Sequence, residues 1–324
     1  MKVFSFDPAS RQAAYEQHGW VHVPSGATDE FCDYVRSEIA ATAAARPLER
    51  QGVTVSKEQF VLRHPDGVDL SAEVFDCVSA LCGLDRDRLV LSERHVNVYS
   101  SDAAPRPRPH KDRFASQVSV GISIEIPEGS QLAVWPDADL GVNPLQRAGL
   151  AETLPPDATP EVVLAGADVV TIADSPGDVQ IFPGSSVWHT RWNPAGAVIA
   201  YFKCNVIGSD PLGEDLRSSA VREASLTVLD DPQRFREAQP CLSRRFESVT
   251  REYALQAGQD WLNVQIWGHA PIQITDAEFE VLRSLDGAAT VDDLLRAAGG
   301  RTNARERALR RMVELGAVDL VGGS

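Results

Sequence analysis

The sequence has few cysteines and no long apolar run, and both absences narrow the possible functions. The five cysteines are odd in number and lack C-x-x-C spacing, which argues against a disulfide framework and against a zinc knuckle. We expect reduced, mostly buried thiols. The first residues carry one lysine but no apolar h-region, and no segment is long enough to span a bilayer, so we expect a cytoplasmic protein.

Basic residues are also in the minority. Lysine and arginine number 31 against 46 acidic residues, which gives a formal net charge of -15. This charge repels phosphate backbones and anionic lipids, so neither nucleic acid nor a membrane is an expected partner. With 43% hydrophobic and 24% charged residues, the 324-residue chain resembles an ordinary globular protein of one large and one small domain.

Two kinds of pattern divide the chain. Residues 8–90 have a mostly helical pattern around a short strand at 20–24, and Phe31, Val35 and Ile39 repeat every four positions after a capping Thr28. Residues 89–206 instead contain short segments rich in valine and isoleucine, separated by proline, glycine and aspartate. These segments are LVLSERHVNVYS, SQVSVGISIEI, DVVTIA, GDVQIFPG and AVIAYFKCNVIG. They predict a β-sandwich or a barrel.

Three of these strands alternate between an apolar face and an unusually polar one. The polar positions are His95, Asn97, Tyr99, Gln117, Ser119, Gly121, Ser123, Tyr201, Lys203 and Asn205. A single strand of this kind can simply have one solvated face. Three such strands favour a barrel whose polar interior holds a ligand.

A histidine and an aspartate follow a proline-rich arm in PRPRPHKDR, residues 105–113. Alternate positions of an extended segment point the same way, so His110 and Asp112 can hold a single ion. A third ligand is available in His189, which we expect just before the next strand, beyond the Pro183-Gly184 turn. Two imidazoles and one carboxylate leave three coordination sites open, the arrangement used for non-heme Fe(II) oxygen chemistry. A chance match or a redox-silent metal site is the alternative.

The motifs PHKD and GDVQIFPGSSVWHT resemble those of the iron- and 2-oxoglutarate-dependent dioxygenases, in particular the phytanoyl-CoA hydroxylase-like branch. The segment HGWVHVPS at 18–25 is also similar to that branch, and the resemblance covers roughly residues 10–210. It implies a mainly β fold with flanking helices, a double-stranded β-helix of the jelly-roll or cupin-like kind. It also implies Fe(II) held by His110, Asp112 and His189, with 2-oxoglutarate and O2 as co-substrates.

The resemblance further implies a cation for the distal carboxylate of 2-oxoglutarate, usually an arginine about ten residues after the second histidine. Val198, Ile199 and Ala200 occupy that place here, so the chain departs from the pattern. We prefer Lys203 to Arg191 for this role, because Lys203 lies on the polar face of its strand. Arg94 and Arg113 remain as further alternatives. Asn97 and Tyr99 are candidates for hydrogen bonds to the other end of the co-substrate.

The carboxylate of Asp112 also bears on the reaction. Related halogenases have a small residue at that place, so its presence favours hydroxylation or another two-electron oxidation. Candidate substrate contacts near the site in sequence are Arg113, Trp135, Trp188 and Trp192, and for the tryptophans core packing is an equally good interpretation.

The C-terminal part is expected to be a separate unit. Thr275 with Glu278 and Asn303 with Glu306 have capping-box spacing, Thr290 can cap a middle helix, and Gly316 can end the last helix. Three helices and the strand-like AVDLV favour a winged-helix-like domain. We therefore divide the chain into a barrel with N-terminal helices at 1–212, a helical connector at 213–260 and a winged-helix-like domain at 261–324.

The role of this tail is left open by the sequence. It has five arginines in and before its last helix, namely Arg301, Arg305, Arg307, Arg310 and Arg311. Residues 271–324 nevertheless hold 9 acidic and 7 basic side chains, which disfavours nucleic acid. The tail faintly resembles winged-helix modules that hold leader peptides, and a packing or homodimerisation unit is the alternative.

These patterns together predict a hydroxylase of an amino-acid or natural-product substrate, either free or carried on a peptide or protein. The competing hypothesis is a non-catalytic barrel that binds a ligand, with the tail as a regulatory module.

Overall fold

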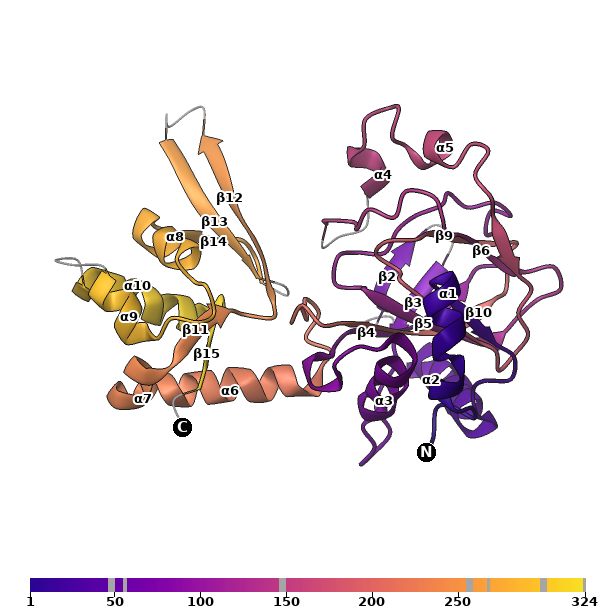
Figure 1. Cartoon of the computed structure of the whole chain (residues 1–324), viewed down its shortest axis with the longest axis horizontal. Helices are drawn as coiled ribbons and strands as arrows, with labels where there is room; N and C mark the ends of the chain where they lie inside the picture. The colour runs from indigo at the N-terminus through magenta and orange to yellow at the C-terminus, as the bar shows by residue number, and fades with distance from the viewer. Residues whose placement is uncertain are drawn as a thin grey trace. The chain divides into compact units, whose positions relative to one another are not determined.

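The computed structural model describes residues 1–45, 50–54, 57–145, 150–254, 259–266, 269–297 and 302–322. The chain forms two compact units, Met1–Gly208 and Ser209–Ser324. Figure 1 shows both, and each is considered by itself.

Two antiparallel sheets build the first unit. The larger has the strand order β1-β8-β5-β10-β4-β3-β2, and the smaller has the order β7-β6-β9. The bounds are β1 (Val21–Val23), β2 (Arg50–Thr54), β3 (Lys57–Val61), β4 (Val90–Tyr99), β5 (Val118–Glu125), β6 (Gln131–Trp135), β7 (Val170–Ile172), β8 (Val179–Phe182), β9 (Trp188–Trp192) and β10 (Val198–Asn205). From β4 onward the chain passes repeatedly between the sheets, which is the winding of a jelly roll, so the predicted barrel is confirmed.

The larger sheet has the two unlike faces that its sequence predicts. Its outer face packs fully buried residues such as Ile122 and Phe202 against Phe31 and Val74 of the N-terminal helices. Its inner face carries the polar positions: Lys203 lies opposite Ser119 on one neighbouring strand and opposite Glu93 on the other. The helices are η1 (Pro8–Arg11), α1 (Gln12–His18), α2 (Asp29–Ala45), α3 (Leu70–Cys82) and η3 (Arg86–Arg88).

Four strands of this unit were not predicted. β2 and β3 lie in the part expected to be helical, and β6 and β9 are only five residues long. His189 is inside β9 rather than just before the next strand. The connection between β6 and β7 carries α4 (Leu150–Thr153) and α5 (Pro160–Val163), which Figure 1 shows on the opposite side of the strands from α2 and α3.

The second unit combines helices with two small sheets. Its elements are α6 (Leu216–Asp230), α7 (Pro232–Glu237), β11 (Gln239–Leu242), β12 (Phe246–Ala254), β13 (Gln259–Ile266), β14 (Ile272–Ile274), α8 (Asp276–Arg283), α9 (Val291–Ala297), α10 (Thr302–Leu315) and β15 (Val318–Val321). The sheets have the orders β12-β13-β14 and β11-β15. Residues 213–260 are therefore part helix and part strand, and Phe235 belongs to the same core as Val264 and Met312. The expected connector therefore contributes to this core rather than linking two separate ones.

Most of the predicted helix signals act as expected. Thr275 and Glu278 form a reciprocal capping box, the Thr290 hydroxyl accepts from the amide of Asp293, and Gly316 ends α10 with a φ of 82°. The capping box at Asn303 is wrong, because α10 begins at Thr302 and the Glu306 carboxylate accepts from two arginines instead.

The three helices of the tail and a closing strand are present, but the strand pairs with β11, which precedes the helices. The winged-helix assignment therefore stays a prediction. Arg301 lies outside the described residues.

All five cysteines are free, and Cys32, Cys77 and Cys204 are buried, as expected for reduced thiols. No helix in the described ranges combines the length and the apolar character needed to cross a membrane.

Candidate metal centre

The arm with the H-x-D motif pairs with β9. The amide of His110 donates to the carbonyl of His189 at 3.0 Å, and the amide of His189 donates back at 2.9 Å. Two residues on, the amide of Asp112 donates to the carbonyl of Gly184 at 2.8 Å. The extended arm thus places both of its side chains beside the histidine of β9, as the one-residue spacing predicts.

One ligand atom from each of His110, Asp112 and His189 lies within 4.8 Å of the others. The Nε2 atom of His189 is 3.8 Å from Oδ2 of Asp112, and the two imidazole centroids are 4.5 Å apart. Asp112 and His189 are buried at 8% and 6% exposure, whereas His110 is exposed. The cluster therefore lies where the polar interior of the barrel meets solvent.

His189 is oriented by its own strand. Its Nδ1 atom lies 2.9 Å from the carbonyl oxygen of Val187, and an N–H there leaves Nε2 free to act as a ligand. Burial lowers the pKa of His189, even though Asp112 favours the charged form. A neutral imidazole is the form that binds a metal.

Asp112 is held by two side chains of the inner face. The Ser119 hydroxyl donates to Oδ2 at 2.7 Å, and the Lys203 ammonium donates to Oδ1 at 2.5 Å. Burial alone would raise the pKa of Asp112, but Lys203 and the two histidines outweigh it and hold that pKa well below its usual range. The group is a carboxylate, as a metal ligand must be.

Gly184 provides the space for this carboxylate. A Cβ atom there would lie 2.3 Å from Oδ2 of Asp112 and 2.1 Å from the Ser119 hydroxyl, closer than atoms can approach. The Pro183-Gly184 turn therefore forms a cradle that any larger residue would fill.

Lys111, between the two ligands of the arm, points away from the cluster. Its ammonium donates to the carbonyls of Asp139 and Gly141 at 2.5 and 2.6 Å, and it lies 4.9 Å from the Trp188 ring centroid. The side-chain amide of Asn143 donates through Nδ2 to the backbone carbonyl of Asp112 at 2.8 Å. These contacts tie the loop after β6 to the ligand arm.

The two preferred candidates for a carboxylate anchor both lie inside the barrel, and each already faces a carboxylate. Lys203 is bonded to Asp112 and lies 3.8 Å from Glu93. Arg191, only 4% exposed, donates to both oxygens of Asp174 at 2.9 and 2.8 Å, and this partner raises the pKa of Arg191 although burial lowers it.

The other two arginines have further roles. Arg94 donates to the carbonyl of Leu62, and Arg113 places Nε 2.8 Å from Glu93. The carboxylate of Glu93 keeps a lowered pKa despite its burial, because Lys203 and Arg113 stabilise the charge.

Asn97 and Tyr99 lie along β4. Asn97 is opposite Ile199, is 4% exposed, and its Oδ1 accepts no hydrogen bond from the part of the chain that the structure describes. This oxygen can accept a bond from a ligand. Tyr99 is at the end of the strand, and the ammonium of Lys57 is 5.8 Å from its ring centroid.

The tryptophans pack rather than line the cluster. Trp135 and Trp188 are 7% and 1% exposed and form a core with Ala133 and residues of the β6–β7 connection. The guanidinium of Arg106 lies 3.7 Å from the centroid of Trp192.

Four residues that hold the site together were not predicted: Ser119, Gly184, Asp174 and Glu93. Each acts through a partner on a separate segment, so its role depends on how the segments pack together. The one available signal was the glycine of the Pro183-Gly184 turn.

The donor set fits a divalent iron ion. Two imidazole nitrogens and one carboxylate oxygen on one side leave positions open, and Val187, Ser119 and Gly184 orient or accommodate the ligands.

No protein-family model and no curated protein matches the sequence. Among solved structures, the chain is similar to the non-heme alpha-ketoglutarate-dependent epimerase SnoN from nogalamycin biosynthesis, at 20% identity and a TM-score of 0.43 over 61% of this chain and 82% of that one. It is also similar to EctD from S. alaskensis, at 13% identity and a TM-score of 0.44 over 63% of this chain and 81% of that one. A prolyl-4-hydroxylase from Pseudomonas putida is similar at 15% identity and a TM-score of 0.39, over 63% of this chain and 97% of that one. At these identities the chemistry has to be inferred from the site.

Proposed function

We propose that the chain is an Fe(II)- and 2-oxoglutarate-dependent hydroxylase of the phytanoyl-CoA hydroxylase-like branch. The observation that carries the proposal is the cluster of His110, Asp112 and His189 at the opening of a barrel with a polar interior. The substrate is an amino acid or natural product, free or carried on a peptide or protein.

The three side chains would hold iron through two nitrogens and one oxygen. When bound, iron with 2-oxoglutarate and O2 supplies the oxidation of a substrate C–H bond, coupled to decarboxylation of the co-substrate to succinate. The retained carboxylate of Asp112 favours hydroxylation over halogenation. The exposed edge of His110 is the side from which substrate reaches the centre, while the buried wall behind Asp112 and His189 excludes water.

Lys203 has two tasks in this proposal. It neutralises Asp112, and a divalent ion competes with it for the same carboxylate. With the charge of Asp112 shared by a metal, the ammonium of Lys203 is available for the distal carboxylate of 2-oxoglutarate. Arg191 is the weaker candidate because Asp174 takes both of its outer nitrogens.

The second unit is proposed to recognise a peptide-borne substrate or to pack two copies of the chain as a homodimer. The proposed role of this unit rests on the faint sequence resemblance of its tail to winged-helix modules that hold leader peptides.

The test is spectroscopic and chemical. Anaerobic addition of Fe(II) and 2-oxoglutarate should give a weak visible charge-transfer band, and a substrate screen should give succinate with a product 16 mass units heavier. Asp112→Ala and His189→Ala should each lose iron binding while the fold remains, and Asp102→Ala, at an exposed position just before the arm, should retain it.

Absence of the band, with no succinate for any substrate, would contradict the enzyme proposal and leave the ligand-binding barrel. Full iron binding in Asp112→Ala would show that the ligand assignment is wrong.

A further inference from the structure

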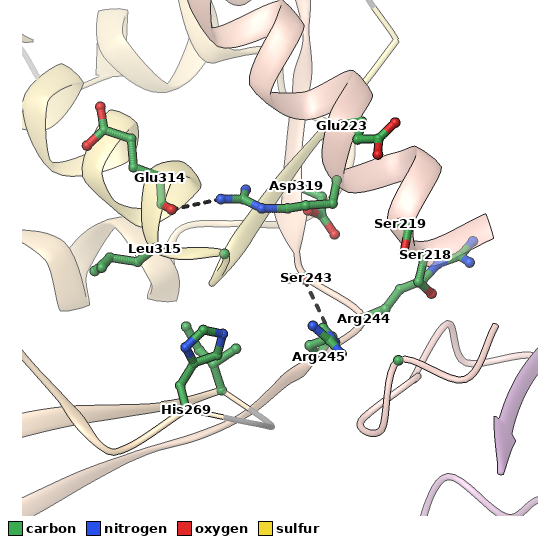
Figure 2. Close-up of a pocket in the computed structure, with 14 residues that line it drawn as sticks. Ser218, Ser219, Glu223, Ser243, Arg244, Arg245, His269, Glu314, Leu315 and Asp319 are labelled. Carbon is green, nitrogen blue, oxygen red and sulfur yellow. Dashed lines mark hydrogen bonds between the residues drawn. The ribbon is translucent and has the colours of Figure 1, made fainter. Parts of the chain in front are cut away.

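A cavity of about 350 Å³ lies in the second unit and is lined wholly by residues between Gly213 and Asp319. The lining, drawn in Figure 2, comes from Gly213, α6, the turn at 243–245, Ile266 and His269, the end of α10, and β15. None of these residues belongs to the metal centre. The cavity is therefore a second candidate binding site, of a size that suits a small ligand.

The cavity contains a buried carboxylate with spare acceptor capacity. Asp319 is 4% exposed, and its Oδ1 atom accepts no hydrogen bond from any described residue. Val318 and Leu320, its neighbours on β15, face the apolar core, so alternation turns Asp319 to the other side of the strand. Burial raises the pKa of Asp319 although Ser243, Arg222 and Arg244 favour its charge. An acceptor left in this state favours a ligand that brings a proton to it.

Two arginines of the 243–245 turn have spare donor capacity. Nη1 of Arg244 and Nε of Arg245 are both buried and donate to nothing in the described ranges of the chain. The Arg245 guanidinium rests against Gly213, where a Cβ atom would lie 2.1 Å from Nη2. Its position is therefore determined by a glycine, and the turn presents two guanidinium groups to one cavity.

The buried charges of the cavity do not cancel. Arg222, Arg244 and Arg245 are each partly buried, and Asp319 is the one buried acid among the described residues of the lining. The glutamates of the lining, Glu223 and Glu314, are exposed and remain in water. Arg222 is already used, because it donates to the carbonyls of Val313 and Glu314 at the end of α10. The remaining excess of positive charge favours an anion.

We propose that this cavity is a phosphate-binding site, which takes inorganic phosphate or the phosphate group of a small monoester. Arg244 and Arg245 supply charge-assisted donors, and Ser218, Ser219 and Ser243 line the same space with hydroxyl groups. A phosphate has enough acceptor positions for donors on several sides.

Asp319 makes the site selective among oxyanions. Inorganic phosphate carries a P–OH group near neutral pH, and a monoester carries one in its singly charged form, below a second pKa of about 6. This group can donate to the unpartnered oxygen of Asp319. Sulfate has no proton to donate near neutral pH. Its negatively charged oxygens would therefore repel the carboxylate of Asp319 without a compensating hydrogen bond. The site should therefore prefer phosphate to sulfate, although both have the same shape.

The test is calorimetric titration of the full chain with inorganic phosphate, with O-phosphoserine as the monoester, and with sulfate. We expect phosphate to bind and sulfate to bind at least about tenfold more weakly. Tighter binding of O-phosphoserine than of inorganic phosphate would identify a monoester as the ligand, and the reverse order would identify the free anion. No binding of either phosphate, or equal binding of sulfate, would overturn the proposal.

Variants locate the site. Arg244→Gln and Arg245→Gln should each lower the affinity for phosphate about 10- to 100-fold, since each removes a charged donor. Arg283→Gln, an exposed arginine of the same unit outside the lining, is the matched control and should change phosphate affinity by less than about twofold. Asp319→Asn should bring sulfate and phosphate to within about threefold of each other, because an amide can donate to either. Unchanged phosphate binding in both arginine variants would place the anion elsewhere and contradict the proposal.

Discussion

Asp112 in the first unit and Asp319 in the second are both buried carboxylates, and their surroundings differ. Asp112, at 8% exposure, accepts hydrogen bonds from Lys203 and Ser119, and its pKa lies well below the usual range. Asp319, at 4% exposure, keeps one oxygen without a donor, and burial raises its pKa. The first is held as an anion that can bind a metal, and the second favours a ligand with a proton.

The difference shows that burial by itself does not decide what an acidic side chain can do. Burial acts in the same direction on both groups, and a lysine 2.5 Å away reverses the outcome at Asp112. The barrel also places a cation beside two other buried acids, Arg191 beside Asp174 and Arg113 beside Glu93. Each prediction below changes one member of this comparison.

The largest effect is expected for Arg191→Ala. It leaves Asp174 buried without its cation, which should lower the free energy of unfolding by about 3–5 kcal/mol. Denaturant unfolding of the first unit measures it. Arg36→Ala breaks an exposed pair with Asp33 and should cost no more than about 1 kcal/mol. If Arg191→Ala unfolds normally but loses affinity for 2-oxoglutarate, Arg191 is the anchor and its pairing with Asp174 is not structural.

Lys203→Ala is expected to weaken the binding of 2-oxoglutarate by about 2–4 kcal/mol, because the desolvated distal carboxylate of the co-substrate loses its partner. Iron affinity should not fall, since the variant removes a competitor for Asp112. Titrations with 2-oxoglutarate at saturating Fe(II) and with Fe(II) alone separate the two effects. Weaker iron binding with unchanged 2-oxoglutarate binding would show that Lys203 only orients Asp112. A loss in neither this variant nor Arg191→Ala would mean that the anchor lies on a different strand.

Gly184→Ala tests the space around Asp112 without touching a charge. Its Cβ would lie within 2.3 Å of the carboxylate, so the ligand must move and iron affinity should fall about 10- to 100-fold. Gly141→Ala is a matched control, because the nearest side-chain atom to its Cβ is 3.4 Å away. Iron titration followed by far-ultraviolet dichroism separates a displaced ligand from a misfolded barrel. Normal iron affinity in Gly184→Ala would mean that the cradle is not needed.

The barrel was predictable because its strands alternate, and its ligand arm because one intervening residue sets two side chains on the same side. The partners of these groups were not predictable, since Ser119 meets Asp112 and Asp174 meets Arg191 only when separate segments pack together. β6 and β9 were missed because segments of only five residues give little periodicity. In the second unit, capping signals located α8 and α9, whereas the pairing of β15 with β11 depends on tertiary contacts.

The smallest effect is expected for Asp319→Asn, and it concerns how folding stability changes with pH. The folded-state pKa of Asp319 is raised, so the folded protein binds this proton more tightly than the unfolded chain. Stability should therefore fall as pH rises from about 4, the ordinary value for aspartate, through the raised folded-state pKa, and then level off. An asparagine has no proton to lose, so the variant should be more stable by about 1 kcal/mol above that range and equal to the parent below it. Thermal unfolding in phosphate-free buffers gives the difference, with Glu314→Gln at the exposed edge of the cavity as the control. A variant that loses stability at high pH would show that Asp319 is held as an anion, like Asp112, and the contrast between the two units would disappear.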